Sequence, residues 1–297
     1  MTEVRPKIQG SLVALVTPMT ADGCIDFEQL HRLVEWHVQQ KTDGLVIMGT
    51  TGESSLVSDQ ELLEVVAKVI DFVKGRILVI AGCGATSTKK AVDLAKKLAK
   101  LEPDALLCVT PYYVKPEQNG LIAHYKAIAD SSKIGIILYN VPGRTGCDLS
   151  RESVLELSTN KNIIGLKDAT GELERVSSLS KQLPEDFALL SGDDETAYGF
   201  IALGGKGVIS VTANVTPNKM AQWTNLAIAG ELTSAKRVFG ELVSLHKVLF
   251  VESNPIPVKW ALHLMDKITS GYRLPLFEPS TASKKLIRQR LEEHGLV

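Results

Sequence analysis

The sequence predicts a (β/α)8 TIM barrel followed by a small C-terminal all-helical domain. Three observations lead to this fold class: eight short apolar runs, a helical segment after each run, and only helical patterns beyond the eighth unit. The runs are apolar at consecutive positions, which is typical of parallel strands covered on both faces. Eight such strands close into a barrel. The main alternative, an open doubly wound sheet, usually has fewer strands and a nucleotide-binding fingerprint.

The expected elements follow one another along the chain with short connections. The eight strand-like runs cover residues 11–19, 44–49, 76–84, 105–113, 135–142, 163–169, 187–194 and 207–214. Helix starts are readable between them, because Asp26 and Ser58 each precede a Gln or Glu by three positions, the spacing of a capping box. Thr216 followed by Pro217 fits a helix cap and a first helical position.

The strand signals stop after the eighth unit, and the rest of the chain has helical patterns only. We therefore expect a catalytic barrel over residues 1–229 and a C-terminal helical domain over residues 230–297. No connection between the two is rich enough in Pro or Ser to indicate a freely moving linker.

The charge balance argues against nucleic-acid and membrane partners. Thirty-three Lys and Arg residues against 34 Asp and Glu leave a formal net charge of -1, so no broad basic field is expected. No apolar run reaches the ~20 residues that span a bilayer. The N-terminal residues lack a basic start followed by an apolar stretch, so we expect no signal peptide and a cytoplasmic location.

Cysteine and histidine spacing predicts neither disulfides nor a metal centre. The four cysteines are scattered without CxxC spacing, and the six histidines show no H-E-x-x-H pattern. The Gly82-Cys83-Gly84 segment lacks the third glycine of a dinucleotide loop, so a tight turn is the better interpretation. We expect no cofactor.

Lys167 is the most informative candidate for chemistry. Active sites of such barrels lie at the carboxyl ends of the strands, and Lys167 lies within the apolar run of the sixth strand. A lysine there loses hydration, which favours the neutral amine. A neutral amine attacks a ketone to form an imine, and the protonated imine acts as an electron sink. The alternative is a lysine that pairs with Asp168 or emerges into solvent.

Other polar residues are expected at the same rim of the barrel. Tyr139 is a candidate proton carrier, and the alternative is a core tyrosine with a satisfied hydroxyl. Thr50 and Thr51 suit the alignment of that phenol and the binding of a carboxylate, unless they only shape a turn that caps the next helix. Arg144 follows a Pro-Gly turn, which suits a guanidinium that binds a carboxylate through two hydrogen bonds. Its alternative is a surface salt bridge, commonly worth little.

Seven ordered motifs resemble one family. They are GTTGES, VTPYY, YNVPGRTG, GLKDATG, LLSGDD, GVISVTAN and NPIPVKW. Together they resemble the dihydrodipicolinate synthase family, within the N-acetylneuraminate lyase-like class I aldolases, over nearly the whole chain. The resemblance implies a lyase that condenses pyruvate with L-aspartate 4-semialdehyde. Its product, 4-hydroxy-tetrahydrodipicolinate, is the first committed to diaminopimelate and lysine.

The resemblance also implies roles for the catalytic residues. Lys167 forms the Schiff base with pyruvate, and Tyr139, Thr50 and Tyr113 form a proton relay. Tyr113 is expected to reach into the site of a neighbouring subunit. That arrangement implies a homodimer at least, and usually a homotetramer built from two dimers.

Four further residues are implied to bind the substrates. Thr51 holds the carboxylate of pyruvate, and Ile209 packs beside the pyruvate. Arg144 orients the relay and binds the carboxylate of the semialdehyde. The backbone near Gly192 contacts the growing adduct.

The second site of the family binds lysine between subunits, and here the match is partial. Ser54 and Tyr112 fit the pattern of lysine-sensitive members. Four positions depart from it, namely Asp59, Leu62, Thr86 and Lys90. Leu62 and Asp59 stand in place of histidines, and Lys90 stands in place of a glutamate. We therefore predict little or no feedback inhibition by lysine.

Two other functions remain open at this stage. The first is another pyruvate-dependent class I aldolase, acting on a sugar acid; Arg144 and the GTTGES motif argue against it. The second is a catalytically silent barrel that only senses a keto acid, which the loss of Lys167 or Tyr139 would suggest. Both residues are present.

Overall fold

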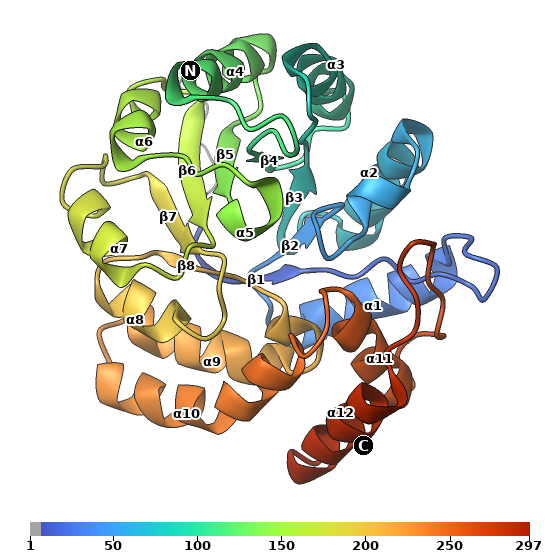
Figure 1. Ribbon diagram of the computed structural model, residues 1–297. Coiled ribbons are helices and arrows are strands. Elements are labelled where there is room, and N and C mark those ends of the chain that lie inside the picture. The colour runs from blue at the N-terminus through green and yellow to red at the C-terminus, as the bar shows by residue number, and fades with distance from the viewer. Residues whose placement is uncertain (1–6) are drawn as a thin grey trace.

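A computed structural model describes residues 7–297 and confirms the predicted (β/α)8 barrel. Eight parallel strands pair in sequence order, and the last pairs with the first, so the sheet is closed (Figure 1). The strands are β1 (Gly10–Ala14), β2 (Gly44–Ile47), β3 (Leu78–Gly82), β4 (Ala105–Val109), β5 (Ile136–Asn140), β6 (Ile163–Asp168), β7 (Ala188–Ser191) and β8 (Gly207–Ser210).

Helices follow the strands and form the outer layer of the barrel, except the short α5, which lies over the centre of the barrel (Figure 1). They are α1 (Phe27–Gln39), α2 (Asp59–Val73), α3 (Thr88–Ala99), α4 (Gln118–Ser131), α5 (Pro142–Thr145), α6 (Arg151–Ser158), α7 (Leu173–Leu179), α8 (Ala197–Ala202) and α9 (Pro217–Ile228). Short 3-10 turns, η1 (Ser54–Leu56) and η2 (Thr212–Asn214), lie at the carboxyl ends of β2 and β8.

The strand side chains divide into two apolar clusters, as expected for strands covered on both faces. One cluster lies inside the barrel and includes Leu12, Ile80, Ile137 and Leu190. A larger cluster lies between the strands and the helices. The interior of the barrel is therefore packed, and a substrate site is expected at the carboxyl ends of the strands.

The predicted helix caps are confirmed at two positions and wrong in detail at a third. The Ser58 side chain accepts a hydrogen bond from the backbone of Glu61, whose carboxylate bonds back to Ser58. Asp26 accepts from the backbone of Gln29, but the side chain of Gln29 donates to the Asp26 carboxylate, so the second bond of a capping box does not form there. Thr216 precedes α9, but its side chain makes no capping bond, because its ψ of 61° departs from the extended backbone that Ser58 has at ψ 159°.

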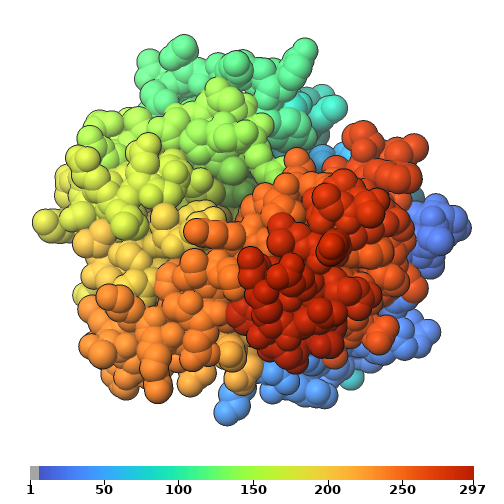
Figure 2. Space-filling model, turned by 60° about the horizontal axis from the view of Figure 1, so that its bottom comes forward, coloured from blue at the N-terminus to red at the C-terminus, as the bar shows by residue number. Residues whose placement is uncertain are grey.

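Three helices follow α9: α10 (Leu232–Val248), α11 (Ile256–Leu264) and α12 (Thr281–Glu293). The first of them packs on α9, and the other two pack on each other beside α1 (Figure 1). In the space-filling view this C-terminal segment covers a large part of one face of the molecule (Figure 2). Within residues 7–297, the structure has no helix of the length and apolarity that crossing a membrane requires.

Candidate active site

Lys167 and Tyr139 lie side by side near the carboxyl ends of adjacent strands. They are register partners of β6 and β5, and both point into the barrel. Lys167 is only 6% exposed, and its Nζ lies 4.0 Å from the centre of the Tyr139 ring. The amine therefore lies over the face of the Tyr139 ring at the mouth of the barrel.

The Lys167 amine is not neutralised by its neighbour Asp168. That carboxylate faces away from the barrel interior, where it pairs with Arg175 at 2.9 Å and accepts from the backbone and the hydroxyl of Thr170. Among the described residues 7–297, no carboxylate forms an ion pair with Lys167. Its alternative interpretations, an ion pair with Asp168 or a solvent-exposed side chain, do not fit this geometry.

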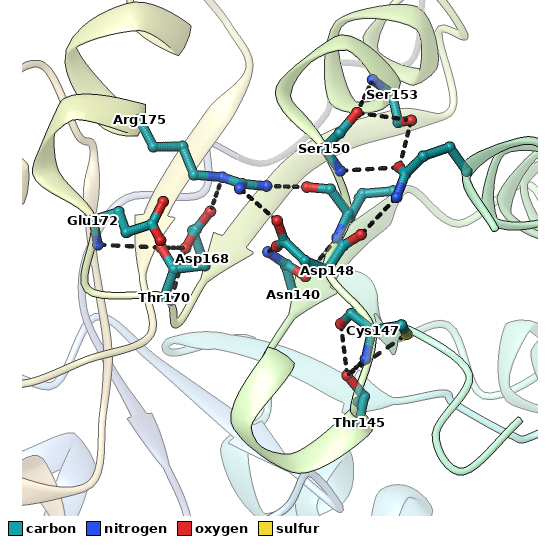
Figure 3. Close-up of polar contacts among 12 residues, drawn as sticks. Asn140, Thr145, Cys147, Asp148, Ser150, Ser153, Asp168, Thr170, Glu172 and Arg175 are labelled. Carbon is teal, nitrogen blue, oxygen red and sulfur yellow. Dashed lines mark hydrogen bonds and ion pairs between the residues drawn. The ribbon is translucent and has the colours of Figure 1, made fainter. Parts of the chain in front are cut away.

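A polar network lies around the carboxyl ends of β5 and β6, and the sequence did not reveal it (Figure 3). The buried Arg175 of α7 pairs with both Asp168 and Asp148, and donates to the carbonyl of Leu149. Asn140, which ends β5, donates to the carboxylate of Asp148. The network thus joins the end of β5 to the end of β6. An arginine on the apolar face of a predicted helix was the one available signal.

Gly192 and Ile209 complete the surroundings of Lys167. A Cβ atom placed on Gly192 would lie 2.9 Å from Cε of Lys167 and 2.8 Å from Cβ of Ala169. No larger residue fits there without displacing the lysine. Ile209 is 1% exposed and belongs to the same inner cluster as Tyr139. The roles of Gly192 toward the adduct and of Ile209 toward pyruvate stay predictions.

A cavity of about 610 Å³ opens at this end of the barrel. Thr50, Tyr139 and Arg144 line it together, although they follow three different strands. Thr51 lies next to Thr50 but is buried, and its hydroxyl accepts a hydrogen bond from Asn254 at 2.9 Å. Arg144 is exposed on α5 and donates to the backbone carbonyl of Asn254 at 3.0 Å. Of the predicted substrate-binding residues, Arg144 therefore lines this cavity, and Thr51 adjoins it through its neighbour Thr50.

The same cavity extends to the six residues considered for lysine binding. Ser54, Asp59, Leu62, Thr86, Lys90 and Tyr112 all line it. Asp59 pairs with Lys97 across the gap between α2 and α3 at 3.1 Å. Two lysines, Lys90 and Lys97, line this part of the cavity together with two aspartates, Asp59 and Asp93, and the apolar Leu62.

Tyr113 stays outside the site of its own chain. Its side chain is 89% exposed, and its backbone has a positive φ of 73°, which is uncommon for a bulky residue. The neighbouring Tyr112 does line the cavity. The contribution of Tyr113 to the site of a neighbouring subunit stays a prediction.

A buried ion pair anchors the loop that carries both threonines, and sequence reasoning missed it. Glu53 follows this loop directly and pairs with Lys259 of α11, and both side chains are almost fully buried. Burial raises the pKa of Glu53 and lowers that of Lys259, while the attraction between the two opposes both shifts. Lys259 also lies 5.0 Å from the ring centre of Tyr272. The loop is held by the C-terminal helices.

Over residues 7–297, the structure has no group of three or more His, Cys, Asp or Glu side chains arranged to hold a metal ion. The Lys167 amine lies over the ring of Tyr139, whose phenol lines the cavity with the hydroxyl of Thr50 and the guanidinium of Arg144. This set suits imine formation, proton transfer and carboxylate binding.

Comparison with known proteins identifies the family. The model of the dihydrodipicolinate synthetase family matches residues 7–294. The 4-hydroxy-tetrahydrodipicolinate synthase of Laribacter hongkongensis is 51% identical over 290 residues, 98% of this chain and 100% of that protein. The chloride-inhibited dihydrodipicolinate synthase of Acinetobacter baumannii, solved with pyruvate, is 48% identical with a TM-score of 0.96, covering 98% and 100% of the two chains.

A third relative is less similar in sequence. The enzyme of Cyanidioschyzon merolae, solved with lysine bound, is 36% identical with a TM-score of 0.94, covering 97% of this chain and 99% of that one. The match to the family model and the two closer relatives each span almost the full length. The chain belongs to the dihydrodipicolinate synthetase family.

Proposed function

We propose that this chain catalyses the 4-hydroxy-tetrahydrodipicolinate synthase reaction, the condensation of pyruvate with L-aspartate 4-semialdehyde. The observation that carries the proposal is the buried Lys167 amine, which has no carboxylate partner among residues 7–297 and lies 4.0 Å from the centre of the Tyr139 ring. An amine in such a place is a nucleophile toward a ketone. The family of the chain supplies the substrates.

The covalent steps follow from the chemistry of an imine. The Nζ of Lys167 adds to the keto carbon of pyruvate, and loss of water leaves the protonated imine. This cation withdraws electrons, so the methyl carbon of pyruvate releases a proton and an enamine forms. The enamine carbon then adds to the aldehyde carbon of the semialdehyde. Finally, the amino group of the semialdehyde attacks the imine carbon, which closes the ring and releases the lysine.

The remaining residues handle protons and carboxylates in this proposal. Tyr139 carries protons to and from the adduct, and Thr50 links its phenol to Tyr113 of a second copy. Thr51 holds the pyruvate carboxylate, and Arg144 holds that of the semialdehyde. The proposed assembly is therefore a homodimer at least, or a homotetramer of two such dimers. Exposure of Tyr113 supports this part of the proposal.

Kinetics with both substrates test the proposal. Removing the guanidinium with Arg144→Ala should reduce kcat/KM for the semialdehyde by about 10²-fold, as expected for a lost charged contact. Trapping of the pyruvate imine by borohydride should survive, because that step does not use the semialdehyde. The exposed Arg151 offers a matched control, and Arg151→Ala should change neither reading.

The outcomes separate this function from its closest alternative. Condensation with the semialdehyde and none with sugar aldehydes supports the proposal. Efficient cleavage of a sugar acid, with no turnover of the semialdehyde, would show that the chain is a different pyruvate aldolase. If Arg144→Ala instead blocked pyruvate trapping and left semialdehyde use intact, the carboxylate assignment would be wrong.

A further inference from the structure

Asn254 connects two parts of the candidate site although it lies far along the chain. It precedes α11 and is 7% exposed. Its side-chain Nδ2 donates to Oγ1 of Thr51 at 2.9 Å, and its backbone carbonyl accepts from Nη2 of Arg144 at 3.0 Å. One residue of the C-terminal segment thus touches both side chains that are proposed to bind substrate carboxylates.

The direction of the first bond has a chemical consequence for Thr51. A hydroxyl has one proton to donate and two lone pairs that accept. Because the oxygen of Thr51 already accepts from the amide of Asn254, its proton is left to point elsewhere. An O–H group that points away from Asn254 can donate to a carboxylate. If Thr51 were instead the donor to Asn254, its only hydroxyl proton would not be free to bind a carboxylate.

The amide oxygen of Asn254 indicates that this side chain does not serve stability alone. Its Oδ1 is buried and has no hydrogen-bond partner among residues 7–297. A buried acceptor without a partner destabilises the folded protein, and each such group calls for an explanation. A positioning role for the donor half of the same amide explains why this group is present here.

We propose that Asn254 is a positioning residue for pyruvate, which orients the hydroxyl of Thr51 so that its proton is donated to the substrate carboxylate. This inference rests on the proposed function. The backbone carbonyl of Asn254 likewise positions the guanidinium of Arg144 for the semialdehyde. The C-terminal helical segment is therefore part of the active site, and its contribution acts through Thr51 and Arg144.

The role proposed for the Asn254 side chain predicts an effect on pyruvate binding and little effect on the semialdehyde. Asn254→Ala removes the donor to Thr51 and keeps the backbone carbonyl that binds Arg144. Losing one well-placed hydrogen bond should raise the pyruvate concentration that half-saturates borohydride trapping by about fivefold to tenfold. The KM of the semialdehyde should change by less than about threefold, because its contact is to the backbone. Ser253→Ala, at the exposed neighbouring position, should change neither value.

A second variant tests the direction of the hydrogen bond between Asn254 and Thr51. Asn254→Asp keeps the shape but replaces the donor by an acceptor, so the Thr51 proton turns toward position 254. We expect a larger loss than with Ala, more than about tenfold in pyruvate half-saturation, because a hydrogen bond to a charged group is lost and a like charge is added. Circular dichroism and thermal unfolding confirm that each variant is folded.

A double-mutant cycle with Thr51→Val tests whether Asn254 acts through that hydroxyl. Without the hydroxyl, adding Asn254→Ala should change pyruvate half-saturation by less than about twofold. A full additional loss in that background overturns the inference, as does an unchanged half-saturation in Asn254→Ala or Asn254→Asp. If the unsubstituted protein itself forms no borohydride adduct, the proposed function fails instead, so the two failures are distinguishable.

Discussion

Replacing Arg175 by Met tests whether the network behind the catalytic strands stabilises the fold. Arg175→Met keeps most of the volume and removes the cation that pairs with Asp168 at 2.9 Å and with Asp148 at 3.0 Å. The side chain of Asp168 is 4% exposed and stays buried with its charge unpaired. Breaking such a pair destabilises by about 3–5 kcal/mol. Asp148 is 47% exposed and can rehydrate, so losing its ion pair with Arg175 adds less than about 1 kcal/mol to the destabilisation.

Urea unfolding at a fixed protein concentration measures this loss. The control is Arg32→Met, which removes a surface ion pair with Glu28 whose side chains are 63% and 81% exposed, and this should cost less than about 1 kcal/mol. Adding Asp168→Asn to Arg175→Met should recover part of the stability, because no buried charge is then left unpaired. If Arg175→Met destabilises no more than Arg32→Met, the reasoning about the buried network is refuted.

Three further predictions use mixing, titration and pH. A mixture of the inactive variants Tyr113→Phe and Lys167→Ala should regain activity after reassembly, because a hybrid can contain one site with both native groups; no recovery in a verified hybrid counts against a shared site. L-Lysine should leave turnover unchanged at sub-millimolar concentrations, because Lys90 adds a repulsion of about 1 kcal/mol or more toward its ammonium; saturable inhibition with matching calorimetric heat contradicts this. Burial lowers the pKa of His37 to about 3 and that of His124 to about 4, from 6.5. The two histidines therefore bind protons in the unfolded chain at pH values where they stay neutral in the native state. The free energy of unfolding should fall as pH drops from 6.5 toward 4, and a flat profile over this range would contradict the prediction.

The local patterns predicted the barrel well because each of its elements has a recognisable pattern within a short segment of sequence. Continuous apolar runs require cover on both faces, and eight of them with helices between allow few arrangements. Capping pairs such as Ser58 with Glu61 act within one helical turn and are readable for the same reason. The cap at Thr216 was wrong in detail, since the backbone angle that decides it depends on the surrounding packing.

The candidate site could be predicted only in part. Lys167 was visible as a charge within an apolar strand, and the family resemblance supplied its companions. The NPIPVKW motif contains Asn254 and Lys259, but their contacts with Thr51 and Glu53 could not be predicted, because more than 200 residues of chain separate the partners. No local pattern encodes such contacts. The division into a barrel of residues 1–229 and a separate helical domain stays a prediction, as does the partner that Tyr113 contacts.

Mapping a borohydride-reduced adduct after incubation with pyruvate tests the central claim most directly. Reduction converts the imine into a stable secondary amine, and peptide mass spectrometry then locates it. We predict one adduct, on Lys167, with none in Lys167→Ala and an unchanged amount in the surface variant Lys126→Ala, whose side chain is 46% exposed. An adduct on another lysine, or none on the unsubstituted protein, would contradict the account.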